Sequence, residues 1–184
     1  MILLVSLLFA EVLSWHTQEV ERVVKAEIVV PANVDAVWEA WTTEAGAKTF
    51  FAPACKIELR VGGAYEMYFN PSGAEGTRGG EGNTILAIQP KNMLAFAWNA
   101  PPHLPTVRQQ RTSVVVRFKE IAPGKTRVTL IESGWGEGDE WDQAFAYFTR
   151  AWQEIVLPRL QYRFAHGPLD WNNPPALKHR DATK

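Results

Sequence analysis

The stretch that decides the fold is TLIESGWGEGDEW, residues Thr129–Trp141. It is typical of the end of a β-strand, a glycine-rich turn and the start of a helix. Leu130 lies on the apolar side of the strand's alternation, and the same count places Glu132 on that side. An inward-pointing acid is a catalytic group, a ligand contact or a residue at the solvent-exposed end of the strand. Which role applies depends on what the strand encloses.

A long helix follows this turn. Asp139 is in the position of an N-cap, and further acidic residues in the first turn suit the helix dipole. Pro158 removes one backbone hydrogen bond inside the helix and should kink it, and Gly167 and Pro168 end it. The apolar residues form a stripe roughly 100° wide, which consists of Trp141, Phe145, Phe148, Trp152, Ile155 and Val156.

The chain before this stretch contains mostly strands of period two. A strand that ends at Pro31 precedes two short helices, the first capped by Asn33. About six further strands follow, each with one apolar face, so we expect an antiparallel sheet with one solvent-facing side. The apolar side of this sheet needs a cover, and the aromatic stripe of the helix supplies one. The sequence therefore predicts an α+β fold in which a curved antiparallel sheet wraps around a long C-terminal helix.

Composition and charge exclude several classes of function. The chain has 184 residues, which suggests one domain, and its net charge is −1 with no basic run, so we expect no nucleic-acid partner. Cys55 is the only cysteine, and the four histidines have no metal-ligand spacing. The glycine-rich segment 71–82 has no phosphate-binding motif and is interpreted as a hairpin loop. We therefore predict no metal and no cofactor.

The two ends of the chain are expected to lie outside the domain. Residues 1–21 form an N-terminal extension whose apolar run is too short for a stable membrane span. That run has the length of a signal-peptide core, although it lacks a positive leading region and an A-x-A site. We favour export, periplasmic or secreted, over a cytoplasmic location, with a plain extension as the alternative. The domain is expected over residues 22–168, followed by a polar tail over residues 169–184.

Five stretches between residues 22 and 166 resemble a known family. They are IVVPANVDAVWEAWTT, FFAPACKIELRVGGAYEMYF, EGNTILAIQPKNMLAFAW, VVVRFKEIAPGKTRVTLIESGW and AFAYFTRAW. The sequence resembles the START/SRPBCC superfamily and, within it, the group named after the C-terminal domain of the activator of the heat-shock protein 90 ATPase. The resemblance implies the helix-grip (START/Bet v 1-like) fold. It also implies a deep, largely apolar cavity between sheet and C-terminal helix, which superfamily members use for lipids, hormones, polyketides or metabolites.

Three functions remain open at this point. The favoured one is a binding protein for a small apolar or amphipathic molecule, with no catalytic residues assigned. The second is an enzyme of the cyclase or hydratase type that uses Glu132 with a tyrosine of the cavity. The third is an interaction module that assists a chaperone. Residues 1–21 are too short to supply the chaperone-gripping domain of the eukaryotic co-chaperone, so that role does not transfer automatically.

Alternation and helix phase select the candidate ligand-binding residues. Glu132 is expected near the mouth of the cavity, because its strand ends directly afterwards. Solvent would meet its carboxylate there, or backbone groups of the turn 134–138 or of the helix start would bond it, with a role as general acid or ligand anchor as the remaining alternative. Val128 also faces inward by the same count. The candidate set is Tyr65, Met67, Phe69, Phe96, Trp98, Val114, Val116, Leu130, Glu132, Phe145, Phe148 and Trp152.

Overall fold

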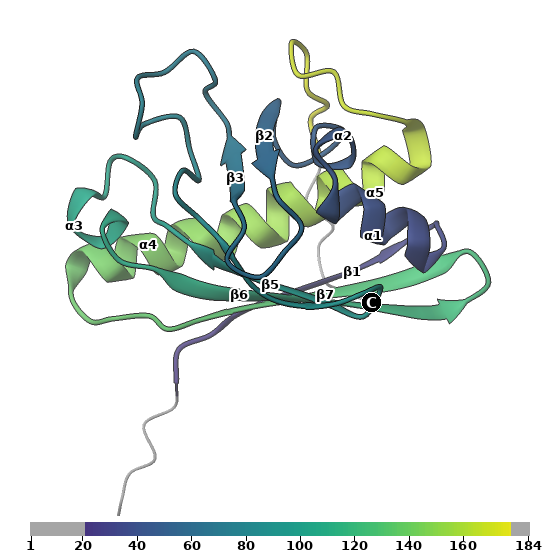
Figure 1. The fold of residues 1–184 in the computed structure, drawn as a ribbon, viewed down its shortest axis with the longest axis horizontal. Coiled ribbons are helices and arrows are strands. Elements are labelled where there is room, and N and C mark those ends of the chain that lie inside the picture. The colour runs from purple at the N-terminus through teal and green to yellow at the C-terminus, as the bar shows by residue number, and fades with distance from the viewer. Residues whose placement is uncertain (1–20, 178–184) are drawn as a thin grey trace, which may run out of the picture.

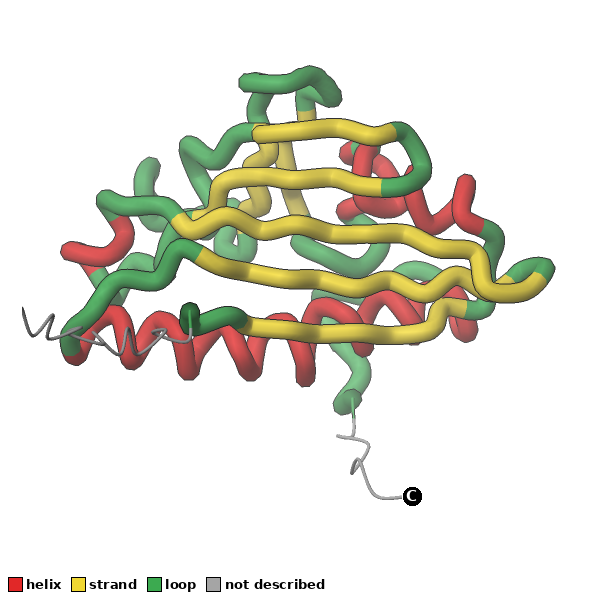
Figure 2. The backbone as a smooth tube through the Cα atoms, turned by 90° about the horizontal axis from the view of Figure 1, so that it is seen from below, coloured by secondary structure: helices red, strands yellow, loops and turns green. Residues whose placement is uncertain are grey.

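A five-stranded antiparallel sheet forms the base of the protein in the computed structural model, which describes residues 21–177. Figure 2 shows its strands side by side. Buried and exposed residues alternate along the central hairpin as the sequence predicts, with Val114 and Val116 buried and Arg117 exposed. In spatial order the strands are β1 (Val24–Val30), β7 (Lys125–Ser133), β6 (Thr112–Ala122), β5 (Met93–Trp98) and β4 (Ile85–Gln89).

A continuous helix lies along the apolar face of this sheet (Figure 1). It comprises α4 (Asp139–Arg150), the π-helical segment η1 (Ala151–Val156) and α5 (Leu157–His166). The predicted α+β helix-grip architecture is therefore confirmed. The predicted cap is wrong, because Gly138 is the N-cap and no side chain bonds the first turn. Gly138 has φ 103°, a conformation that favours glycine, so Asp139 becomes the first helical residue.

Pro158 disturbs the helix differently from the predicted kink. The Leu157 N–H donates to the carbonyl of Trp152, five residues back, so the backbone widens into a π-helical turn before the proline. Pro158 has no N–H to continue the regular pattern, and α5 resumes with proline in its first turn. The wide turn shifts the helical phase, and Leu157 and Leu160 become buried beyond it. The helix thus continues across the proline with a local expansion.

The remaining cover of the sheet comes from smaller elements on the same face (Figure 1). They are α1 (Val34–Thr42), α2 (Glu44–Ala47) and a separate two-stranded sheet of β2 (Ala54–Ile57) and β3 (Tyr65–Tyr68). The sequence predicts these strands as part of one sheet, whereas they form a separate sheet that is joined to β4 by an isolated bridge between Ala64 and Thr84 and a few neighbouring backbone hydrogen bonds. One further element, α3 (Pro105–Arg108), lies in a proline-rich segment that carries no helical pattern.

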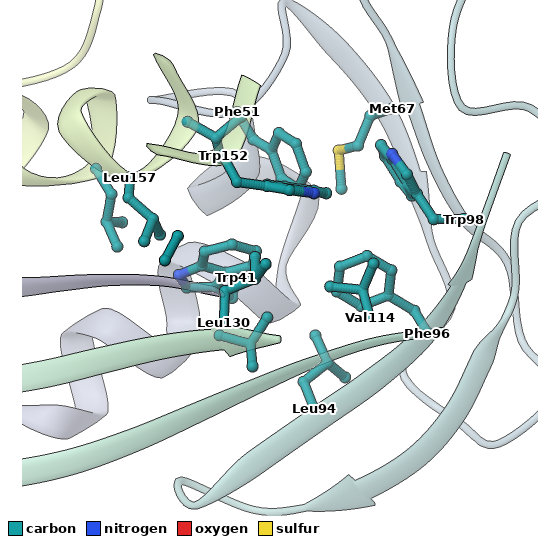
Figure 3. Packing of buried hydrophobic residues seen from close by; sticks show 14 of the residues in the cluster. Trp41, Phe51, Met67, Leu94, Phe96, Trp98, Val114, Leu130, Trp152 and Leu157 are labelled. Carbon is teal, nitrogen blue, oxygen red and sulfur yellow. The ribbon is translucent and has the colours of Figure 1, made fainter. Parts of the chain in front are cut away.

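Aromatic side chains fill the space between these layers. Trp41 of α1 packs edge-on against Phe50 and Phe51, with ring centroids 5.3 and 5.4 Å apart. Figure 3 shows Trp41 and Phe51 among side chains of the sheet and of the long helix. Most of the eight tryptophans therefore serve the core, and part of this aromatic cluster also borders the cavity described below.

The described residues extend the packed domain slightly beyond the predicted boundary at residue 168. Leu169 is buried, and the Trp171 indole donates a hydrogen bond to the carbonyl of Lys48 at 2.6 Å. Residues 1–20 and 178–184 lie outside the described part, and with them most of the predicted N-terminal extension and the end of the predicted tail. None of the described helices combines the length and apolarity that crossing a membrane requires.

Candidate functional site

A partly open cavity of about 440 Å³ lies against one side of the long helix. Its other walls are the loop that follows β3 and the segment that follows β5. We call it the helix cavity. Its lining is Phe51, Phe69, Asn70, Thr77, Arg78, Gly79, Gly80, Trp98, Asn99, Ala100, Pro101, Pro102, His103, Tyr147, Phe148, Ala151, Trp152, Ile155, Val156 and Arg159.

Aromatic rings form the inner wall of the helix cavity. Trp98 from β5 and Trp152 from η1 are directed toward one another, with centroids 5.7 Å apart (Figure 3). Phe51 stacks on Trp98 at 5.7 Å, and Phe148 stacks on Trp152 at 6.3 Å. The sheet, the α2–β2 connection and the helix each contribute to this wall, so it depends on the whole fold. Such a surface favours flat or flexible apolar groups.

The rim of the helix cavity exposes large apolar side chains to solvent. Phe69 is 45% exposed, Tyr147 43% and Ile155 42%. They come from three separate places, namely the end of β3, α4 and η1, and all three line the same cavity. Exposed apolar side chains that gather around a concavity mark a binding surface more often than scattered ones do.

The loop of residues 70–82 is held firmly as a wall of the helix cavity. The Arg108 guanidinium donates to the carbonyls of Gly76 at 2.7 Å and Gly79 at 2.8 Å, and also to that of Ala100. Glu81 accepts hydrogen bonds from the backbone N–H groups of Gly76 and Arg78. Gly79 has φ 148° and a Cβ there would lie 2.5 Å from a β3 carbonyl, so the loop approaches β3 too closely for any side chain. The predicted hairpin loop is thus fixed by side-chain hydrogen bonds and forms an ordered wall of the helix cavity.

Glu132 does not lie at the mouth, so the predicted solvated position is wrong. The residue is 0% exposed. Its carboxyl accepts hydrogen bonds from the Thr112 hydroxyl and from the Trp152 indole N–H, both at 2.6 Å. Burial raises the pKa of Glu132 to about 7, and the two hydrogen bonds only partly oppose this rise. The acid therefore sits behind Trp152, which separates it from the helix cavity.

The structure divides the predicted site residues into three groups. Phe69, Trp98, Phe148 and Trp152 line the helix cavity. Phe145 lies outside it, against Trp135 at 5.2 Å. The others are closely packed in the interior, namely Tyr65, Met67, Phe96, Val114, Val116, Leu130 and the carboxyl-bearing Glu132.

Several residues that line the helix cavity are absent from the ligand-binding set predicted from the sequence. Ile155 and Val156 belong to the predicted aromatic stripe, which was the available signal for them. Phe51 follows a short helix and has no periodic pattern of its own, and the loop residues carry no apolar signal. Arg159 is recognisable from the sequence only as a cation near the end of the helix.

Other reactive groups have ordinary structural roles. Cys55 is buried in β2, and burial raises the pKa of its thiol to about 11, so it is a poor nucleophile. The Tyr65 hydroxyl donates to the carbonyl of Trp41 at 2.9 Å. Within residues 21–177, no three His, Cys, Asp or Glu side chains gather in a way that could hold a metal ion.

The curved sheet, its long helix and the cavity between helix and loops define a helix-grip domain of the SRPBCC type. The sequence matches the family of Activator of Hsp90 ATPase homolog 1-like proteins over residues 31–164, and the chain belongs to this family. No curated protein matches the sequence.

Solved structures show the same fold. The Aha1 dimer from Colwellia psychrerythraea is 18% identical, with TM-score 0.61 over 79% of this chain and 98% of that one. CalU16 from Micromonospora echinospora is 22% identical, with TM-score 0.58 over 82% and 78%. An HSP90 activator from Plasmodium falciparum is 12% identical, with TM-score 0.58 over 79% and 96%. At these identities the likeness concerns the fold.

Proposed function

We propose that the protein binds a small apolar or amphipathic molecule in the helix cavity. The observation that carries this proposal is the aromatic cavity with an exposed apolar rim formed by Phe69, Tyr147 and Ile155. Its volume of about 440 Å³ falls within the range of ~300–1,000 Å³ that is common for small-molecule sites. A helix-grip fold is compatible with ligand binding and with chemistry of the polyketide-cyclase type. The two functions are therefore distinguished by the geometry of the site.

The geometry favours binding over catalysis. Glu132 is closed off by Trp152, and its hydrogen-bond partners are a threonine and a tryptophan. General acid–base chemistry needs a titratable group within hydrogen-bond reach of the substrate. His103 and Tyr147 meet edge-on at the rim, with centroids 5.9 Å apart, and in the described part of the chain no hydrogen bond joins them. These positions support a binding protein better than a cyclase or hydratase.

The family name suggests a second function, assistance to a chaperone. The fold neighbours include one named as an HSP90 activator, which keeps this alternative open for our chain. Its direct test is the ATPase rate of purified Hsp90 with and without this protein. Stimulation that survives when the helix cavity is blocked would assign that activity to another surface.

Titration with a neutral apolar dye such as Nile red tests the proposed binding. Ala151 lines the helix cavity, so Ala151→Phe should fill it. Ala146 is exposed on the same helix and does not line the cavity, so Ala146→Phe is a matched control. We expect saturable binding to the wild type and the control, and loss of most of the signal in Ala151→Phe. Absence of saturable binding in the wild type would contradict the proposal.

A further inference from the structure

Arg159 lines the helix cavity without an ion-pair partner among the described residues. It lies in the first turns of α5, half-buried, and its guanidinium is stacked over the Trp171 ring at 5.3 Å. Among residues 21–177, no carboxylate lies within ion-pair distance of it, and no hydrogen bond from it is formed. Its guanidinium carries five N–H donors in a planar fork.

The other two arginines around this cavity differ from Arg159. Arg78 forms an ion pair with Glu81 at 2.7 Å and lies over the Tyr68 ring. Arg108 is occupied by loop carbonyls and lies 3.6 Å from Glu81. A protein normally pairs a guanidinium that it partly buries, because desolvating an unpaired charge is costly. Burial lowers the pKa of Arg159, and no carboxylate opposes this effect. An unpaired cation in a wall built mainly of apolar groups is therefore an available anion site.

The position of Arg159 sets the orientation of a ligand. The helix residues that line the cavity run from Tyr147 through Phe148 and Trp152 to Arg159. At ~1.5 Å per residue, this is a path of about 18 Å. The aromatic wall occupies its middle, and the His103–Tyr147 contact marks the end opposite to Arg159. An extended single chain could lie on the aromatic wall with one end at the guanidinium.

We propose that the ligand of the helix cavity is an amphiphile with an anionic oxygen head group, a carboxylate or a phosphate, which Arg159 binds through paired hydrogen bonds. This inference rests on the proposed binding function and names its ligand class. A guanidinium fork matches the two oxygens of either head group, and such bonds are stronger than those between neutral groups. The apolar tail lies along Trp152 and Phe148.

The test compares three probes with the same tail, namely lauric acid, lauryl phosphate and lauryl alcohol. Isothermal titration calorimetry at neutral pH gives the affinity of each for the wild type. We expect the two anions to bind roughly ten- to hundredfold more tightly than the alcohol, the effect of hydrogen bonds to a charged group. A preference for one anion identifies the head group. Equal affinity for acids and alcohol would overturn the inference while leaving the proposed function intact.

Variants of Arg159 and Arg150 show which residue is responsible for any preference for the anionic probes. Arg159→Met keeps an unbranched apolar stem, so it should bind the alcohol as the wild type does and lose the preference for anions. Arg159→Lys keeps the charge without the planar fork of donors, so it should retain part of the preference for anions. Arg150→Met is the matched control, because Arg150 is exposed on the same helix outside the cavity. An anion preference that survives in Arg159→Met would overturn the inference. Failure of every probe and of the neutral dye would instead overturn the proposed function.

Discussion

Glu132 and Arg159 show how differently two parts of the interior accommodate an ionisable group. Glu132 is fully buried, and Thr112 and Trp152 satisfy its carboxyl. Arg159 is half-buried, its guanidinium lies over the Trp171 ring, and it forms no ion pair with the described residues. The packed side around Glu132, which we call the sealed side, satisfies this carboxyl with two hydrogen bonds, whereas the open side at the helix cavity leaves the Arg159 donors available. Available donors beside an apolar surface, rather than an inward-pointing acid, therefore mark the candidate site.

Trp152 is the boundary between the two sides. Its indole N–H belongs to the sealed side, where it bonds Glu132, while its ring forms part of the cavity wall with Trp98 and Phe148. It is carried by the π-helical turn η1 before Pro158. The local widening of the helix therefore lies at the point where packed core changes into cavity.

Truncation of a side chain should cost much more stability on the sealed side than at the cavity rim, and this is the largest contrast that we predict. Leu130→Ala removes a fully buried side chain and should lower the free energy of unfolding by about 2–5 kcal/mol, because it leaves a void. Ile155 is already 42% exposed, so Ile155→Ala should cost less than about 1 kcal/mol. Urea unfolding measures both values.

Binding of the neutral dye should follow the reverse order. Ile155→Ala removes part of the cavity rim and should weaken binding, whereas Leu130→Ala should leave it close to the wild-type value at temperatures where the variant is folded. Equal losses of stability, or equal losses of binding, would show that the interior is not divided as described.

Stability should fall as the pH rises, because of Glu132. Burial raises its pKa to about 7 from the usual 4.5, so the folded state holds a proton that the unfolded state has released in this window. The contribution is fully present below about pH 4.5 and is lost as the pH rises through about 7. The shift corresponds to a loss on the order of 3 kcal/mol.

Glu132→Gln isolates this contribution. The glutamine oxygen can still accept from Trp152, and its amide can donate to Thr112, so the shape and the contacts are kept. The variant should match the wild type in urea unfolding at pH 5 and exceed it at pH 8. Parallel pH profiles for the two proteins would show that Glu132 is not the sealed acid described here.

The fold was predictable because its signals are local. Alternation along β6 and β7 depends only on which face of a strand each residue occupies, and the structure buries Val114, Val116 and Leu130 accordingly. The aromatic stripe of the long helix follows the same logic with a period of 3.6 residues. One apolar face on each element leaves few ways to pack them, and the helix-grip arrangement is one of these.

The site was less predictable because depth and empty space are not local. Alternation places Glu132 on the inner face, but its partners are Thr112 and Trp152, each 20 residues away along the chain. Nothing in the strand indicates that the helix covers its end. The cavity is likewise the volume that Phe51, Trp98 and the loop leave unfilled, and no single element encodes that volume.

The hydroxyl of Thr112 allows the sealed side to be tested with the smallest change. Thr112→Val removes the 2.6 Å hydrogen bond to Glu132 and should cost about 1–3 kcal/mol at pH 8, where the carboxylate is charged. The loss should be smaller at pH 5, because the bond to a protonated acid is weaker. Thr126→Val is the matched control, since that buried hydroxyl donates to the carbonyl of Ala32 and its loss should not vary with pH. Urea unfolding of both variants at the two pH values makes the comparison, and equal behaviour would contradict the coupling of Thr112 to the ionisation of Glu132.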